Sequence, residues 1–132
     1  MESESMGPNI NVGDLVFLVA PDRNGPITSW AEGHETGYAK FATYPDRQGH
    51  PVYGDVIVYR PNGDATVHPI LHRAIVWNKN ATTPGYITKG DNNLVVDQDA
   101  YYAGIGAIQP VKNEWVIGKA VFSVPYLGYL FL

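Results

Sequence analysis

The hydrophobic positions of this 132-residue chain fall into short runs that are bounded by glycine, proline and polar residues. Runs rich in Val, Ile, Tyr and Phe with such boundaries are typical of β-strands. Pro69 falls inside one run, where we expect a bulge or an edge position because proline cannot donate to a ladder. The pattern predicts five strands, at residues 14–20, 55–60, 66–77, 85–88 and 116–124.

The connections between these runs predict how the strands pair. Residues 61–64 read Pro-Asn-Gly-Asp, and Asn-Gly is the favoured centre of a tight hairpin turn. We therefore expect strands 55–60 and 66–77 to pair antiparallel. Residues 21–51 are rich in Gly, Pro and polar residues without a clear period, so we expect a long surface insertion there. Residues 1–132 are thus predicted to form one mainly β domain of antiparallel sheets, with a loop-rich insertion and little helix.

Composition limits the chemistry that this domain can perform. With 45% hydrophobic residues, the chain can bury a core without covalent staples. It has no cysteine, which excludes a disulfide framework, a thiol nucleophile and a cysteine-ligated zinc site. Nine basic residues stand against thirteen acidic ones, and no basic run could neutralise a string of phosphates. We therefore expect no nucleic-acid partner.

The distribution of apolar residues also bears on membranes. No apolar stretch approaches the roughly 20 residues that a spanning helix needs, and the first residues lack the basic and apolar regions of a secretory signal. We expect this chain itself to be soluble. Residues 121–132 carry no charge and end in Tyr-Leu-Phe-Leu. We interpret them as a final strand, and the alternative is a segment that lies against a membrane.

Two serines close to the start of the chain, Ser3 and Ser5, are candidate nucleophiles. A serine hydroxyl becomes reactive only when a base takes its proton. Among the histidines, His34 and His50 fall in the loop-rich segment and His68 precedes a proline. His72 falls on a predicted strand, which would hold its side chain at a fixed angle, although a strand histidine taken alone is more often structural.

A cluster at residues 88–98 brings two carboxylates, Asp91 and Asp97, close to a predicted strand end. They could cap a turn and face solvent, or one could accept a hydrogen bond from His72 and fix its tautomer. Spacing alone leaves both open. The cluster lacks the alternating oxygen ligands and terminal Glu of an EF-hand, so we expect no metal and no cofactor.

Five segments, taken in chain order, resemble the boxes of signal peptidase I in its archaeal and endoplasmic-reticulum form. The bacterial form carries a lysine in the base box, where this form and the present chain carry a histidine. The segments are 3–8 (SESMGP) with 12–14 (VGD) for the nucleophile box, 53–59 (YGDVIVY) for the strand box, 70–73 (ILHR) for the base box, 89–93 (KGDNN) with Asp97 for the acidic box, and 118–128 for the closing segment.

The resemblance implies a role for each matching residue. Ser5 would be the nucleophile, His72 the general base and then acid, and Asp97 the carboxylate that orients His72. Asp91 would support the site, and Ser3 would help to bind the oxyanion beside the backbone N–H of the nucleophile. The apolar residues that match the small primary specificity pocket are Met6, Ile70 and Leu71.

The chain departs from the family pattern at two positions near the nucleophile. Glu4 replaces the usual glycine between the two serines, and Gly7 stands where the family often has a bulkier or acidic residue. We expect these changes to lower activity. The membrane anchor that normally precedes the nucleophile is missing, so we expect a truncated or naturally anchorless domain.

The implied function is that of a serine endopeptidase that removes signal peptides from exported pre-proteins after small residues, of the Ala-x-Ala type. It would work on the extracytoplasmic side of a membrane, archaeal outer or reticulum lumenal, with its full-length form membrane-bound. The sequence does not define accessory subunits. One alternative is a non-enzymatic β domain that binds a partner or a membrane through its aromatic C-terminal face. Another alternative makes Lys89 the base, as in Ser-Lys peptidases.

Overall fold

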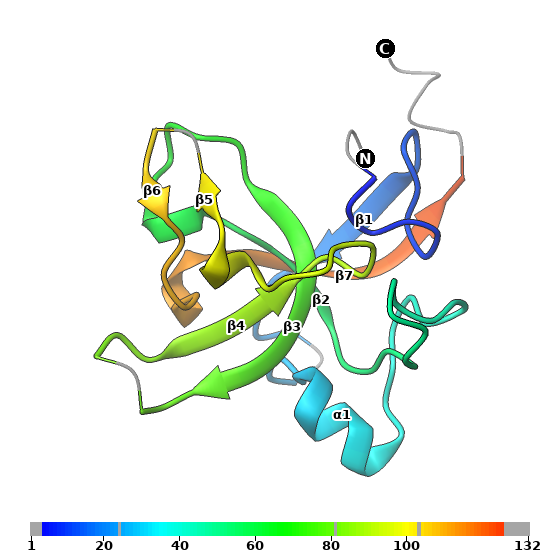
Figure 1. The fold of residues 1–132 in the computed structure, drawn as a ribbon. Helices are drawn as coiled ribbons and strands as arrows, with labels where there is room; N and C mark the ends of the chain where they lie inside the picture. Colours follow the sequence, from blue (N-terminus) through cyan, green and yellow to red (C-terminus); the bar gives the residue numbers. More distant parts are fainter. Residues whose placement is uncertain (1–3, 24, 81, 103, 126–132) are drawn as a thin grey trace.

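The computed structural model describes residues 4–23, 25–80, 82–102 and 104–125, which form a strongly bent antiparallel sheet (Figure 1). Its strand order is β1-β7-β2-β3-β4, and a second, two-stranded sheet is formed by β5 and β6. The prediction of a mainly β domain with antiparallel sheets is confirmed. The strands are β1 (Leu15–Val19), β2 (Val56–Tyr59), β3 (Ile70–Asn78), β4 (Gly85–Lys89), β5 (Tyr101–Tyr102), β6 (Gly106–Ala107) and β7 (Val116–Val124).

The five predicted strands are the five strands of the large sheet, with small differences at their ends. β3 begins at Ile70, immediately after Pro69, so the proline precedes the strand and does not form a bulge within it. The predicted antiparallel pairing of β2 with β3 is confirmed, and Tyr59 pairs with Ile70. Residues 121–124, the start of the stretch interpreted as a final strand, belong to β7, and residues 126–132 lie outside the described residues.

The predicted Asn-Gly hairpin turn is wrong in one respect. Asn62 and Gly63 do adopt positive φ values, 54° and 71°, as that pair favours. They lie, however, in the short 3₁₀ segment η1 (Pro61–Gly63), and the chain runs on through residues 64–69 before β3 begins. The pair therefore turns the chain locally without closing the hairpin.

Residues 21–51, predicted as a loop-rich insertion, contain the helix α1 (Trp30–Thr36). Ser29 and Glu32 form a capping box at its start, and Gly37 ends it with a φ of 84°. Gly33 lies so close to the backbone of Gly54 that an added Cβ would stand 2.7 Å from its nitrogen. Helix α1 is thus packed tightly against the start of the strand box. The remaining short helical segments are η2 (Asp97–Asp99) and η3 (Asn113–Trp115).

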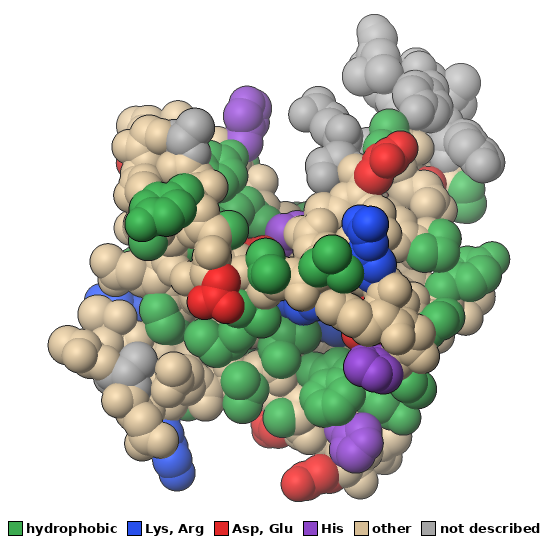
Figure 2. All heavy atoms as spheres, viewed as in Figure 1, with side chains coloured by type: hydrophobic (Ala, Val, Ile, Leu, Met, Phe, Trp, Pro, Cys, Tyr) green, Lys and Arg blue, Asp and Glu red, His purple; other side chains and the backbone are tan. Residues whose placement is uncertain are grey.

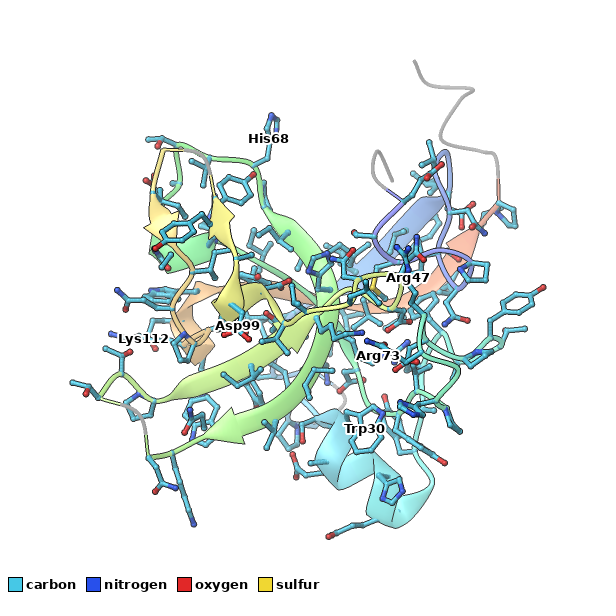
Figure 3. All side chains as sticks on the ribbon, in the orientation of Figure 1. Trp30, Arg47, His68, Arg73, Asp99 and Lys112 are labelled. Carbon is cyan, nitrogen blue, oxygen red and sulfur yellow. The ribbon has the colours of Figure 1, made fainter. Side chains whose placement is uncertain are left out.

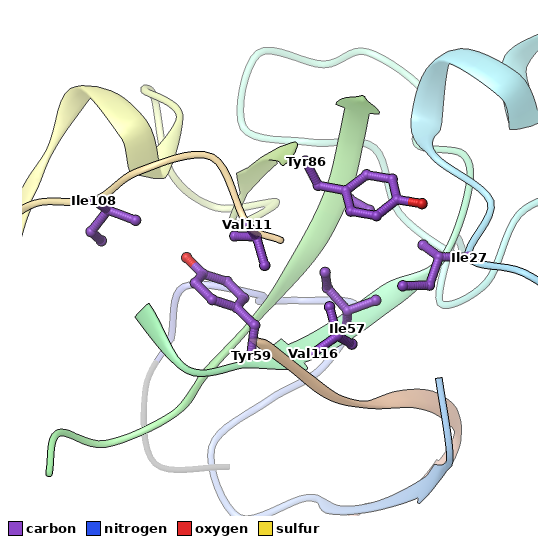
Figure 4. Packing of buried hydrophobic residues seen from close by; sticks show 8 residues of the cluster. Ile27, Ile57, Tyr59, Tyr86, Ile108, Val111 and Val116 are labelled. Atoms are coloured by element: carbon purple, nitrogen blue, oxygen red, sulfur yellow. The ribbon is translucent and has the colours of Figure 1, made fainter. Parts of the chain in front are cut away.

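The core has two parts because neighbouring residues of a strand face opposite sides of a sheet. Ile57 and Tyr59 point into a larger cluster with residues from β4, β7 and the segment before α1 (Figure 4). Val56 points the other way, into a smaller cluster with Met6 and Ile10 of the N-terminal segment. The N-terminal segment is therefore part of the folded core. No helix in the described ranges is both long and apolar enough to cross a bilayer.

The capping box gives a stability prediction. Ser29 is buried and its hydroxyl accepts from the backbone N–H of Glu32 at 3.3 Å. Replacing Ser29→Ala leaves that N–H without its partner, and we expect the free energy of unfolding to fall by about 1 kcal/mol. Urea unfolding measures the change. The exposed Glu35→Gln on the same helix is the control, and equal stabilities of both variants would contradict this role of the cap.

Candidate active site

A serine and a histidine that lie far apart in the sequence meet at one end of β3. His72 is buried on this strand and pairs across the sheet with Ile57. Its Nε2 lies 2.9 Å from the Oγ of Ser5. A neutral imidazole that carries its proton on Nδ1 can accept the serine proton at Nε2. The arrangement can therefore activate Ser5 as a nucleophile.

The other ring nitrogen of His72 faces a carboxylate. Nδ1 lies 2.8 Å from Oδ1 and 2.7 Å from Oδ2 of Asp97, the first residue of η2. Asp97 is only 5% exposed. An acceptor in this position holds the proton on Nδ1 and stabilises the imidazolium that forms when Nε2 takes a proton. The structure thus brings the three residues Ser5, His72 and Asp97 into one hydrogen-bonded line.

The N-terminal segment is tied to the loop after β4, and this contact places Ser5. The carbonyl oxygen of Ser5 accepts from the backbone N–H of Asn92 at 2.8 Å. Met6, fully buried beside it, accepts from the N–H of Asp91 through its sulfur at 3.4 Å. Gly90 allows this close approach, since an added Cβ would stand 2.5 Å from the Ser5 carbonyl oxygen and 3.0 Å from Nε2 of His72.

A buried ion pair anchors the same loop on the opposite side. Arg73 is completely buried, and its Nε and Nη2 donate to the two oxygens of Asp91, each at 2.8 Å. Figure 3 shows Arg73 between the sheet and the segment that follows α1. Its remaining hydrogen bonds go to backbone carbonyls in that region, which are those of Lys40, Phe41, Tyr53 and Gly54. The pair therefore joins the insertion, β3 and the loop after β4.

A cleft of about 630 Å³ opens beside the serine. Its walls include Ser5, His72 and Asp97, the apolar side chains of Ile70 and Leu71, and residues of the hairpin formed by β5 and β6. Figure 2 shows it as a notch between the lobe that carries this hairpin and the rest of the molecule. His68 also lines the cleft and stands at its outer rim (Figure 3). The cleft can admit an extended chain to the serine.

Not every predicted site residue lies at this cleft. Ile70 and Leu71 line it, whereas Met6 is buried in the core under the serine, because its side chain fills the space between Ile10 and Val56. Lys89 lines a different cleft, beside Trp30 of α1, and its Nζ donates to the Gly90 carbonyl at 3.4 Å. Ser3 lies outside the described residues.

Several residues that complete the site were not identified from the sequence. Tyr59 and Thr88 both donate to Oδ2 of Asp97 at 2.7 Å, and Arg73 holds Asp91. Two sequence features could have identified them. Thr88 directly precedes the acidic box, and Tyr59 places a hydroxyl on the buried face of a predicted strand. Among the described residues, no group of three or more acidic or histidine side chains is placed to hold a metal ion.

The buried ion pair gives a second prediction. Replacing Arg73→Met leaves the Asp91 carboxylate buried without a counter-charge, and we expect a loss of about 3–5 kcal/mol in the free energy of unfolding. The double variant Arg73→Met with Asp91→Leu removes both charges and should lose less than the single one. Urea unfolding measures both. Arg47→Met, at an exposed arginine, is the control, and a loss from Arg73→Met no larger than the control's would contradict the role of the pair.

Comparison with known proteins places these features in a family context. No family model matches the chain. The signal peptidase complex catalytic subunit sec11 of Pyrenophora tritici-repentis is 32% identical over 129 residues, which are 97% of this chain and 57% of that protein. The corresponding subunit of Tuber melanosporum is 33% identical over 129 residues, 97% of this chain and 58% of the relative.

The subunit named sec11 in Schizosaccharomyces pombe is 32% identical over 129 residues, again 97% of this chain, and here 61% of the relative. The chain thus spans a little over half the length of the curated relatives that it matches. The resemblance read from the sequence boxes is confirmed by these similarities. The chain is a homologue of signal peptidase I of the endoplasmic-reticulum type, over nearly all of its own length.

Proposed function

We propose that this chain is a serine endopeptidase that removes signal peptides from exported pre-proteins, with an acyl-enzyme on Ser5. The observation that carries the proposal is the distance of 2.9 Å between Oγ of Ser5 and Nε2 of His72, beside a cleft that can hold a peptide. The similarity to subunits named as catalytic supports the same function.

The geometry supports the following steps. His72 takes the Ser5 proton at Nε2 while Oγ attacks the scissile carbonyl carbon, and Asp97 stabilises the resulting imidazolium. The imidazolium then gives that proton to the leaving amine, which frees the new N-terminus and leaves the acyl group on Ser5. A water that gives a proton to His72 then attacks the ester carbon. The bond from that carbon to Oγ breaks, His72 returns the proton to Oγ of Ser5, and the signal peptide leaves with a free carboxyl terminus. Ser3 and the backbone N–H of Ser5 are the proposed donors to the oxyanion.

Substrate selection follows from the walls of the cleft. An extended peptide would lie beside the strand that carries His72 and form main-chain hydrogen bonds with it. Ile70 and Leu71 present apolar surface next to the serine. We infer that this apolar wall excludes large side chains sterically and needs no charge, which suits small residues at the first and third positions before the cut.

The setting of the reaction belongs to the same proposal. The substrates would be pre-proteins that carry signal peptides, and the reaction would take place on the extracytoplasmic side of a membrane, with a membrane-bound full-length form. The relatives are named as subunits of a complex, so accessory subunits are part of the proposal for this chain as well. Asp91, through Arg73 and the loop after β4, would support the site without contacting the substrate.

Mutation can distinguish His72 as the base from the alternative in which Lys89 is the base. We expect Ser5→Ala and His72→Ala each to lower kcat/KM for a synthetic pre-protein peptide ending its signal in Ala-x-Ala by about 10⁴-fold or more, because each removes a reacting group. Lys89→Ala should retain activity within about tenfold. The assay uses detergent, and mass spectrometry locates the cut. Retained cleavage by Ser5→Ala would sink the proposal, and loss only with Lys89→Ala would favour the Ser-Lys alternative.

The proposed selection of small residues gives a prediction for the rate at which altered substrates are cut. Replacing the alanine before the cut by leucine adds bulk that the apolar wall cannot admit, and we expect kcat/KM to fall by roughly 100-fold. The same change at the residue between the two alanines is the control and should have little effect. Equal rates for all three peptides would show that the cleft does not select small residues.

A further inference from the structure

The carboxylate of Asp97 is held by more than His72. Its Oδ2 accepts from the hydroxyl of Tyr59 at 2.7 Å and from the hydroxyl of Thr88 at 2.7 Å. Both donors are fully buried. We propose that Tyr59 and Thr88 are positioning residues, which orient the Asp97 carboxylate and set the pH range in which His72 acts as a base. The part of this inference that concerns catalysis rests on the proposed function.

The sheet order explains why these two residues reach the same atom. β3, which carries His72, lies between β2 and β4. Tyr59 comes from β2 and Thr88 from β4. The two strands that flank the histidine therefore each contribute one hydroxyl to its carboxylate partner. Tyr59 pairs with Ile70 and Thr88 pairs with Ala74, both on β3, so the backbone ladders fix the positions of both residues.

The direction of each hydrogen bond is determined by its surroundings. Thr88 accepts at its hydroxyl oxygen from Nε2 of Gln98 at 3.2 Å, and its own N–H donates to Oε1 of Gln98 at 2.9 Å. This reciprocal contact orients the Gln98 amide and leaves Thr88 one hydroxyl proton to donate, for which Oδ2 of Asp97 at 2.7 Å is a closer acceptor than the Tyr59 hydroxyl oxygen at 3.3 Å. Burial and the nearby Asp97 charge raise the pKa of Tyr59. The tyrosine hydroxyl therefore remains a donor at every pH at which a histidine titrates.

Two effects on His72 follow. Nδ1 of His72 lies within hydrogen-bond distance of both carboxylate oxygens, 2.8 Å from Oδ1 and 2.7 Å from Oδ2, and the two hydroxyl donors at Oδ2 fix the rotation of the carboxylate against the imidazole. Each hydroxyl also directs the positive end of its dipole toward Asp97 and hence toward the imidazole. A positive potential disfavours the imidazolium. Removing either hydroxyl should therefore favour protonation of His72 and move its titration midpoint to higher pH.

The other titratable groups packed around this pair are engaged elsewhere in the described part of the chain. Arg73, the neighbour of His72 on β3, binds Asp91. Lys89, the neighbour of Thr88 on β4, donates to a backbone carbonyl, and Tyr102 of β5 donates to the carbonyl of His68. Asp99 of η2 is exposed. Tyr59 and Thr88 are thus the hydroxyl groups in direct contact with the carboxylate.

The test is a titration that does not depend on substrate. The full chain is labelled with ¹³C-histidine, and the signal of His72 is followed by NMR against pH after assignment with His72→Ala. We expect Tyr59→Phe and Thr88→Val each to raise the midpoint by about 0.5 to 1 pH unit. Thr88→Ser, which retains the hydroxyl, should restore the wild-type midpoint. Tyr38→Phe is the matched control, because Tyr38 donates to another buried carboxylate, that of Asp55.

Each outcome decides the proposal. The proposal is supported if the His72 midpoint is higher in Tyr59→Phe and Thr88→Val and keeps its wild-type value in Thr88→Ser and Tyr38→Phe. Unchanged or lower midpoints in Tyr59→Phe and Thr88→Val overturn it. If Tyr59→Phe does not fold, the comparison of Thr88→Val with Thr88→Ser decides alone. In the peptide assay, the acid limb of the kcat/KM profile should move in the same direction. Raised midpoints in a chain that cuts no peptide would overturn the proposed function and leave the positioning role in place.

Discussion

The fully buried guanidinium of Arg73 is the contact on which the arrangement of the site depends. It neutralises Asp91 and takes up four backbone carbonyls from the segment between α1 and β2. Removing a charge from water costs several kcal/mol, and only a complete set of partners offsets this cost. The chain must therefore bring β3, the loop after β4 and the insertion together in one geometry before the arginine can be buried.

Because adjacent residues of a strand face opposite sides of a sheet, this anchor also determines where His72 points. Arg73 fills one face of β3 while His72 projects from the other, toward Ser5 and Asp97. On that face, the carboxylate is satisfied by hydroxyls from both flanking strands. The two carboxylates of the acidic box thus have separate environments, one held by a cation and one by neutral donors and an imidazole.

The sequence predicted the strands well because β-branched and aromatic runs between glycines and prolines are a local signal. It did not predict α1, since seven residues are too few to show a helical period, although Ser29 and Glu32 carried the capping-box signature. Spacing alone left Asp91 and Asp97 undistinguished, and only the family resemblance assigned Asp97 to His72, because it is the packing that places Asp97 at Nδ1 of His72 and Asp91 at Arg73. Met6 was expected at the pocket because it matches a pocket position of the family motif, while its side chain fills the core.

The position of Ser5 is the remaining consequence of this packing. The serine belongs to a segment before the first strand, so no ladder of the sheet holds it. Its carbonyl is bound by Asn92, and Met6 beside it accepts from Asp91. Both donors are backbone groups of the loop whose carboxylate Arg73 holds. Catalysis by a serine and a histidine requires their atoms within hydrogen-bond distance. The distance from Ser5 to His72 is therefore maintained by a buried ion pair on the opposite face of the strand, and the reacting atoms are aligned only in the folded chain.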